Sequence, residues 1–129
     1  MNIRKLASTT AILGLLLVAF TVSGLAAEPQ GMLKASAVKA LVLNAKTPAD
    51  HMKLARHYTA MAEKHDSEAK EHEALAVQYT NHPTAHETKH PMSAETAGHC
   101  KLYAEHCRKA AAEMRAMAAA HTEMAKAAK

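Results

Sequence analysis

The stretch at residues 47–80, TPADHMKLARHYTAMAEKHDSEAKEHEALAVQYT, decides the fold of this 129-residue chain. Read in sevens, it repeats alanine in one column and histidine or tyrosine in the column beside it. At about 100° per residue these columns lie on one stripe of a helix. The stripe therefore predicts a long amphipathic helix with alanine at its packing face. Its columns are Ala55, Ala62, Ala69 and Ala76; His51, Tyr58, His65, His72 and Tyr79; and Leu54, Met61, Glu68 and Leu75.

The sequence also indicates where this helix begins and ends. Thr47 can accept the backbone N–H of Asp50 as an N-cap, and Pro48 suits the first helical position. Asp50 carries a negative charge at the positive end of the helix dipole. His82-Pro83 interrupts the pattern, because proline disfavours helical backbone in the residue before it. We expect a helix over residues 48–80.

A second long helix is predicted over residues 94–127, with alanine at every seventh place. Ser93 or Thr96 can cap it. A shift of 49 residues superposes it on the first helix, as a duplication would. A histidine-rich linker at 81–92 permits an antiparallel turn, and residues 33–45 predict a shorter helix. The fold class is all-α, an antiparallel helical hairpin. The second alanine column is Ala97, Ala104, Ala111, Ala118 and Ala125.

The composition limits the core and the partners. The chain has no tryptophan and one phenylalanine, so its alanine seams bury little area. We expect the thin core to be covered by the short N-terminal helix, or by a second copy in a homodimer that forms a four-helix bundle. The formal charge is +4, and it falls by two without Arg4 and Lys5. That small excess argues against a nucleic-acid partner.

Residues 1–27 read as a secretory signal. Arg4 and Lys5 precede an apolar core at residues 11–22, and small residues follow around Ala26 and Ala27. The apolar run is short for a membrane span. We therefore expect a single helical domain at 28–129, periplasmic or secreted and without a stable membrane anchor.

The chain resembles short exported bacterial helical-hairpin proteins of unknown function. The resemblance rests on the start Thr47-Pro48-Ala49-Asp50-His51, continued by Leu54, Ala55 and Tyr58, and on His99-Cys100 in the second helix. It implies the fold and export, and it implies no catalytic residues.

Several residues could bind metal. An antiparallel turn at 86–92 sets Tyr79 near Cys100, His72 near Cys107, His65 near Met114 and Tyr58 near His121. Thiolate, thioether and imidazole together suit Cu(I), with Zn(II) second. The function expected first is therefore that of an exported metal-binding protein that captures, stores or buffers copper. We expect the site at the linker end of the hairpin, so His51 should contribute little. The candidate metal ligands are His65, His72, His82, His86, His90, His99, Cys100, Cys107 and Met114.

A structural interpretation stands beside the metal hypothesis. Histidines on a helix seam can form a polar packing layer, and the methionines can fill the core. The spacing of His99-Cys100 and His106-Cys107 matches no standard zinc motif. On this interpretation the protein is a metal-free helical interaction or envelope-stress module.

Enzymatic function is not indicated. The sequence has no glycine-rich phosphate loop, no serine nucleophile elbow and no CxxCH haem attachment. A Cys107–His72–Glu68 triad is conceivable, but an alanine-lined seam offers no evident substrate cleft.

The two cysteines are expected not to bond to each other. Cys100 and Cys107 are two helical turns apart, about 10.5 Å along the axis. A disulfide requires Cα atoms within about 7 Å. They can remain thiols, bind metal, or bridge to another molecule, for instance in a dimer that places Cys100 against Cys107 of its mate.

Overall fold

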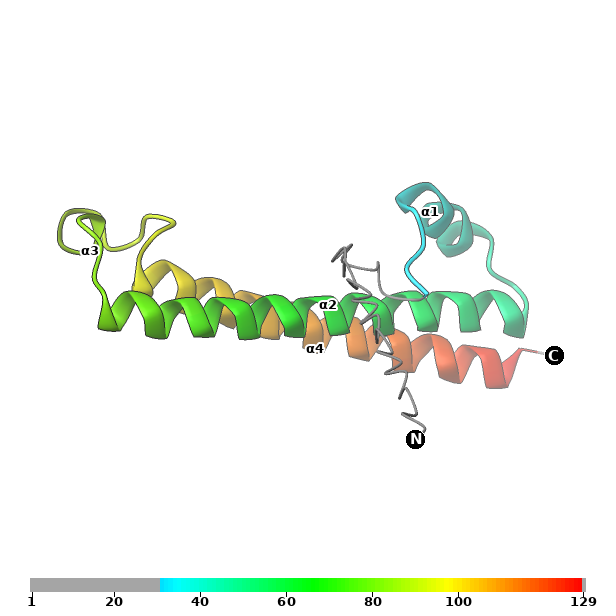
Figure 1. Ribbon diagram of the computed structural model, residues 1–129. Coiled ribbons are helices and arrows are strands. Elements are labelled where there is room, and N and C mark those ends of the chain that lie inside the picture. Colours follow the sequence, from blue (N-terminus) through cyan, green and yellow to red (C-terminus); the bar gives the residue numbers. More distant parts are fainter. Residues whose placement is uncertain (1–30, 129) are drawn as a thin grey trace, which may run out of the picture.

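The protein is a long antiparallel helical hairpin, as the sequence predicts. The computed structural model describes residues 31–128, so the predicted signal at 1–27 lies outside the described part. The helices are α1 (Ala35–Asn44), α2 (Pro48–Asn81), α3 (His86–Lys89) and α4 (Ala97–Ala127). Figure 1 shows α2 and α4 side by side, with α3 at the turn and α1 beside the opposite end. No helix in residues 31–128 is long and apolar enough to cross a bilayer.

The alanine columns form the interface between α2 and α4. Every member of both columns is buried, and Ala69 and Ala111 are fully enclosed. Because alanine ends at Cβ, two such helices can approach closely along their whole length. Leu54 is one of the few large side chains that is fully buried. The core is therefore a narrow seam.

Two ion pairs across the helices define the register. Arg108 donates to the Glu73 carboxylate at 2.8 and 2.5 Å, and Arg115 pairs with Asp66. Glu73 and Asp66 are one heptad apart on α2, as Arg108 and Arg115 are on α4. Exposed pairs of this kind contribute at most about 1 kcal/mol each. Because both partners repeat at a spacing of seven residues, the two pairs favour this register over registers shifted by one heptad.

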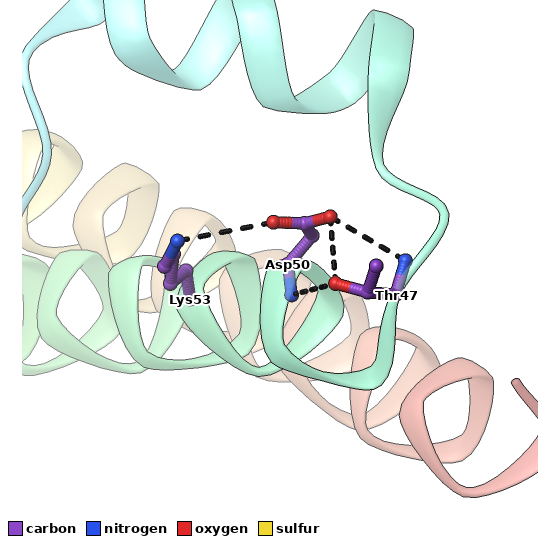
Figure 2. Close-up of polar contacts among 3 residues, drawn as sticks. All are labelled: Thr47, Asp50 and Lys53. Atoms are coloured by element: carbon purple, nitrogen blue, oxygen red, sulfur yellow. Dashed lines mark hydrogen bonds and ion pairs between the residues drawn. The ribbon is translucent and has the colours of Figure 1, made fainter. Parts of the chain in front are cut away.

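The predicted start of α2 is confirmed. The Asp50 backbone N–H donates to the Thr47 hydroxyl oxygen at 3.2 Å, and the Thr47 N–H donates to the Asp50 carboxylate at 3.4 Å. The Thr47 hydroxyl donates to the same carboxylate at 2.7 Å, and Lys53 lies 3.8 Å from it (Figure 2). The hydrogen bond from the Thr47 side chain lowers the pKa of Asp50. This capping box is local, so the sequence alone specifies it.

The second long helix starts three residues later than predicted. Thr96 is its N-cap and accepts the His99 N–H at 3.3 Å. Its buried hydroxyl lies 2.6 Å from the Pro91 carbonyl and 2.7 Å from that of Ser93, so the linker fixes it in place. Gly98 is required here, since a Cβ at this position would lie 2.6 Å from the Pro91 carbonyl oxygen.

The segment that leads into α1 is bonded to α2 through a histidine. The Leu33 backbone N–H donates to His57 Nδ1 at 3.1 Å, and His57 is buried. No side chain of α1 is buried. An accepting Nδ1 requires the neutral ring, so this contact depends on the protonation of one side chain.

Acid should destabilise the fold through His57. Burial lowers the pKa of His57, and burial together with His51 lowers the pKa of His121. Because the folded state favours the neutral rings, their contribution is complete above the ordinary pKa of 6.5 and is lost as pH falls below it. The thermal unfolding midpoint should therefore fall between about pH 7.5 and about pH 5. His57→Gln should show a smaller fall, and an equally steep fall would exclude His57 as a source.

A cluster of His65, Glu68 and Cys107 between the long helices

Three potential metal ligands meet in the middle of the hairpin. His65 Nδ1 lies 3.0 Å from Glu68 Oε2, and Cys107 Sγ donates to the same oxygen at 3.8 Å. The three donor atoms all lie within 4.8 Å of one another. In residues 31–128 this is the one such group of three or more histidine, cysteine or acidic side chains. We call it the His–Glu–Cys cluster.

The helix spacing explains how the cluster forms. His65 and Glu68 are three residues apart on α2, so both side chains project from the same face. Cys107 comes from α4, in the column that faces α2, and packs against Ala69 and Ala104. The two small alanine side chains leave room for the sulfur atom at the seam. The cluster thus bridges the two helices.

The cluster borders an open groove of about 200 Å³. Its lining adds Tyr103, His106 and Ala110 from α4. His65 and Glu68 are half-buried, and Cys107 is buried. An ion could therefore reach the donor atoms from solvent, and the exposed His106 lies at the rim.

The electrostatics hold Cys107 as a thiol at neutral pH. Burial raises the pKa of Cys107, and the neighbouring Glu68 carboxylate raises it further, while a hydrogen bond with Tyr103 opposes the shift. A thiol with a raised pKa is a poor nucleophile. A bound cation would reverse this balance, because it stabilises both the thiolate and the carboxylate. The arrangement therefore suits metal binding better than covalent catalysis.

The structure groups the predicted ligands differently from the sequence-based pairing. His72 was expected opposite Cys107, but its ring packs on Tyr103 and lies near His99, with centroid distances of 4.0 and 6.5 Å. His65, which the sequence pairs with Met114, joins Glu68 and Cys107, and Met114 itself is half-buried. The pairing of Tyr58 with His121 is confirmed, since their rings stack at 5.6 Å.

The linker histidines lie away from the protein interior. His82, His86 and His90 are exposed, and the rings of His86 and His90 lie 6.4 Å apart. The only three-ligand cluster in the described chain thus lies along the seam, whereas the sequence suggested the linker end. A local signal for it existed, since Glu68 occupies a seam position where an apolar residue is usual.

Both cysteines are free, in agreement with the helix geometry. Cys100 is 1% exposed and Cys107 is 6% exposed. Burial raises the pKa of Cys100, and the Glu87 carboxylate adds to the shift. A disulfide to the mate in a dimer would require both side chains to leave the seam, so the burial gives no support to that arrangement.

Comparison with protein-family models, with curated proteins and with solved structures found no match to this chain.

Proposed function

We propose that this protein is an exported metal-binding protein that captures, stores or buffers a transition-metal ion at the His–Glu–Cys cluster. The observation that carries the proposal is the meeting of imidazole, carboxylate and thiol donors from two helices within 4.8 Å. The signal-like sequence at residues 1–27 supports export to the periplasm or the medium.

The donor spacing is close to that of one tetrahedral ion. Zinc bonds of about 2.0–2.3 Å place nitrogen, oxygen and sulfur ligand atoms roughly 3.3–3.7 Å apart. The nitrogen–oxygen and sulfur–oxygen distances in the cluster are 3.0 and 3.8 Å. The nitrogen and sulfur atoms lie within 4.8 Å of each other, so side-chain adjustment must also bring this pair closer for one ion to bind all three. The groove leaves space for a fourth ligand such as water.

The donor types favour Zn(II) and leave Cu(I) as the second ion. Thiolate and imidazole serve both ions, but a carboxylate is a hard ligand that suits Zn(II) better. This order reverses the sequence-based preference, because Glu68 takes the position beside Cys107 that the sequence pairing gave to His72. Binding would release the Cys107 proton, so affinity should rise with pH.

Removing one cluster ligand should weaken binding strongly. We expect Cys107→Ser and His65→Ala each to weaken the tightest Zn(II) binding by more than about tenfold, or about 1.4 kcal/mol. Competition titration against a chromogenic chelator under reducing conditions measures this, with Cu(I) titrated in parallel. His82→Ala, which removes an exposed imidazole at the end of α2, is the matched control. Parent-like affinity in Cys107→Ser would refute the proposed site.

A metal-free interaction module is the second candidate. Val42 and Leu43 of α1 are 55% and 72% exposed beside an apolar groove of about 530 Å³ between α1 and α2. Exposed apolar surface of this kind often marks protein contacts. This candidate predicts that the parent protein binds neither Zn(II) nor Cu(I) in the same titrations.

A further inference from the structure

Two histidines face each other near the end of the hairpin opposite the linker. His51 comes from the first turns of α2 and His121 from the last turns of α4. Their Nδ1 atoms lie 3.2 Å apart, and their rings stack with centroids 5.5 Å apart at 25°. We call them the histidine pair. In a hydrogen bond between neutral rings, one Nδ1 carries the proton and the other presents its lone pair.

The ring of His121 is held in place by a second aromatic contact. Tyr58 stacks on it with centroids 5.6 Å apart and planes at 11°. Burial and the neighbouring His51 lower the pKa of His121, which favours its neutral ring. A neutral, oriented imidazole is the form of histidine that binds metal ions.

We propose that His51 and His121 form a second metal site, in which the two Nδ1 atoms bind one Zn(II) ion and water completes the shell. Two nitrogens on a tetrahedral zinc ion lie about 3.3 Å apart, given Zn–N bonds of about 2.0–2.1 Å. The pair already has this separation, at 3.2 Å. The ring that carries hydrogen on Nδ1 transfers it through water to Nε2, so binding releases no net proton.

This site differs from the His–Glu–Cys cluster in strength and in access. It supplies two imidazoles, because in residues 31–128 no third histidine, cysteine or acidic side chain completes a group there. Its affinity should therefore be lower than that of the cluster, and its open positions should allow rapid exchange. The inference does not rest on the proposed function, because the two sites share no residue.

Zinc titration calorimetry can separate the two sites. In Cys107→Ser, binding at the cluster is weakened, and the histidine pair should still bind one zinc ion. Adding His51→Ala or His121→Ala to that variant should weaken the remaining binding by at least about tenfold. Adding His90→Ala instead should leave the remaining binding unchanged. This is a matched control, because it also removes one imidazole of a pair, here that of His86 and His90.

Nuclear magnetic resonance provides a readout that needs no substitution at the pair. In Cys107→Ser, the ring signals of His51 and His121 should shift first as zinc is added, ahead of those of His86 and His90. Circular dichroism shows whether each variant keeps its helices. If the His51 and His121 signals stay unchanged, or if both added substitutions leave the affinity as before, the second site is refuted.

Discussion

Replacing Ala111 with leucine should destabilise the hairpin by about 1–3 kcal/mol or more, because overpacking a close-packed core costs this much. Ala111 is fully enclosed in the alanine column of α4. Leucine adds three carbon atoms where the backbone of α2 approaches, and the seam can accept them only if the helices separate. Helix propensity does not oppose the effect, since leucine is nearly as good a helix former as alanine.

The neighbouring residue provides the matched control. Ala112 follows Ala111 on α4 and is exposed, so Ala112→Leu makes the same chemical change outside the seam. Its effect should stay within about 0.5 kcal/mol, as is usual for surface substitutions. Urea unfolding followed by circular dichroism measures both variants. Equal midpoints for the two would show that α2 and α4 do not pack along their alanine columns.

Leu54→Ala should cost about 2–5 kcal/mol, the range found when a buried leucine is truncated. Leu54 is 0% exposed and is one of the few large side chains in a core built mainly of alanine. The loss of its apolar area and the cavity left behind act in the same direction. A small domain with a total stability of about 5–15 kcal/mol would lose much of it.

Leu102→Ala is the control for this truncation. Leu102 lies on α4 and is 43% exposed, so the same deletion there should change the stability much less. The comparison again uses urea midpoints. If Leu102→Ala destabilised the protein as strongly as Leu54→Ala, the described core would not account for the stability of the fold.

The fold could be predicted because its determinants are local and periodic. The alanine columns set the packing faces of both helices, and the Thr47–Asp50 capping box sets the start of α2. The start of α4 was predicted less accurately. Ser93 is an equally good local cap, and Thr96 is selected by hydrogen bonds to linker carbonyls that exist only in the folded turn.

The site depends on which side chains of neighbouring helical turns meet across the seam, and the sequence specifies this less firmly. His65 and Cys107 were predicted as ligands, but their partners changed. Glu68, one helical turn before His72 on α2, lies beside Cys107, while Tyr58 stacks on His121 as the same register predicts. The ion pairs of Arg108 with Glu73 and of Arg115 with Asp66 select the observed register. Both long helices carry many exposed charges of both signs, so many ion pairs are conceivable. The sequence alone therefore could not identify these two.

In the proposed site, one ion is held by His65, Glu68 and Cys107 together. X-ray absorption spectroscopy of zinc-loaded protein identifies the atoms bound to the ion. Using the His121→Ala variant with less than one equivalent of zinc confines the ion to the cluster. We expect one sulfur ligand at about 2.3 Å and nitrogen or oxygen ligands at about 2.0–2.2 Å. Adding Cys100→Ser should leave this shell unchanged, and adding Cys107→Ser should remove the sulfur. A shell without sulfur in the parent site, or one whose sulfur disappears with Cys100→Ser, would contradict the assignment.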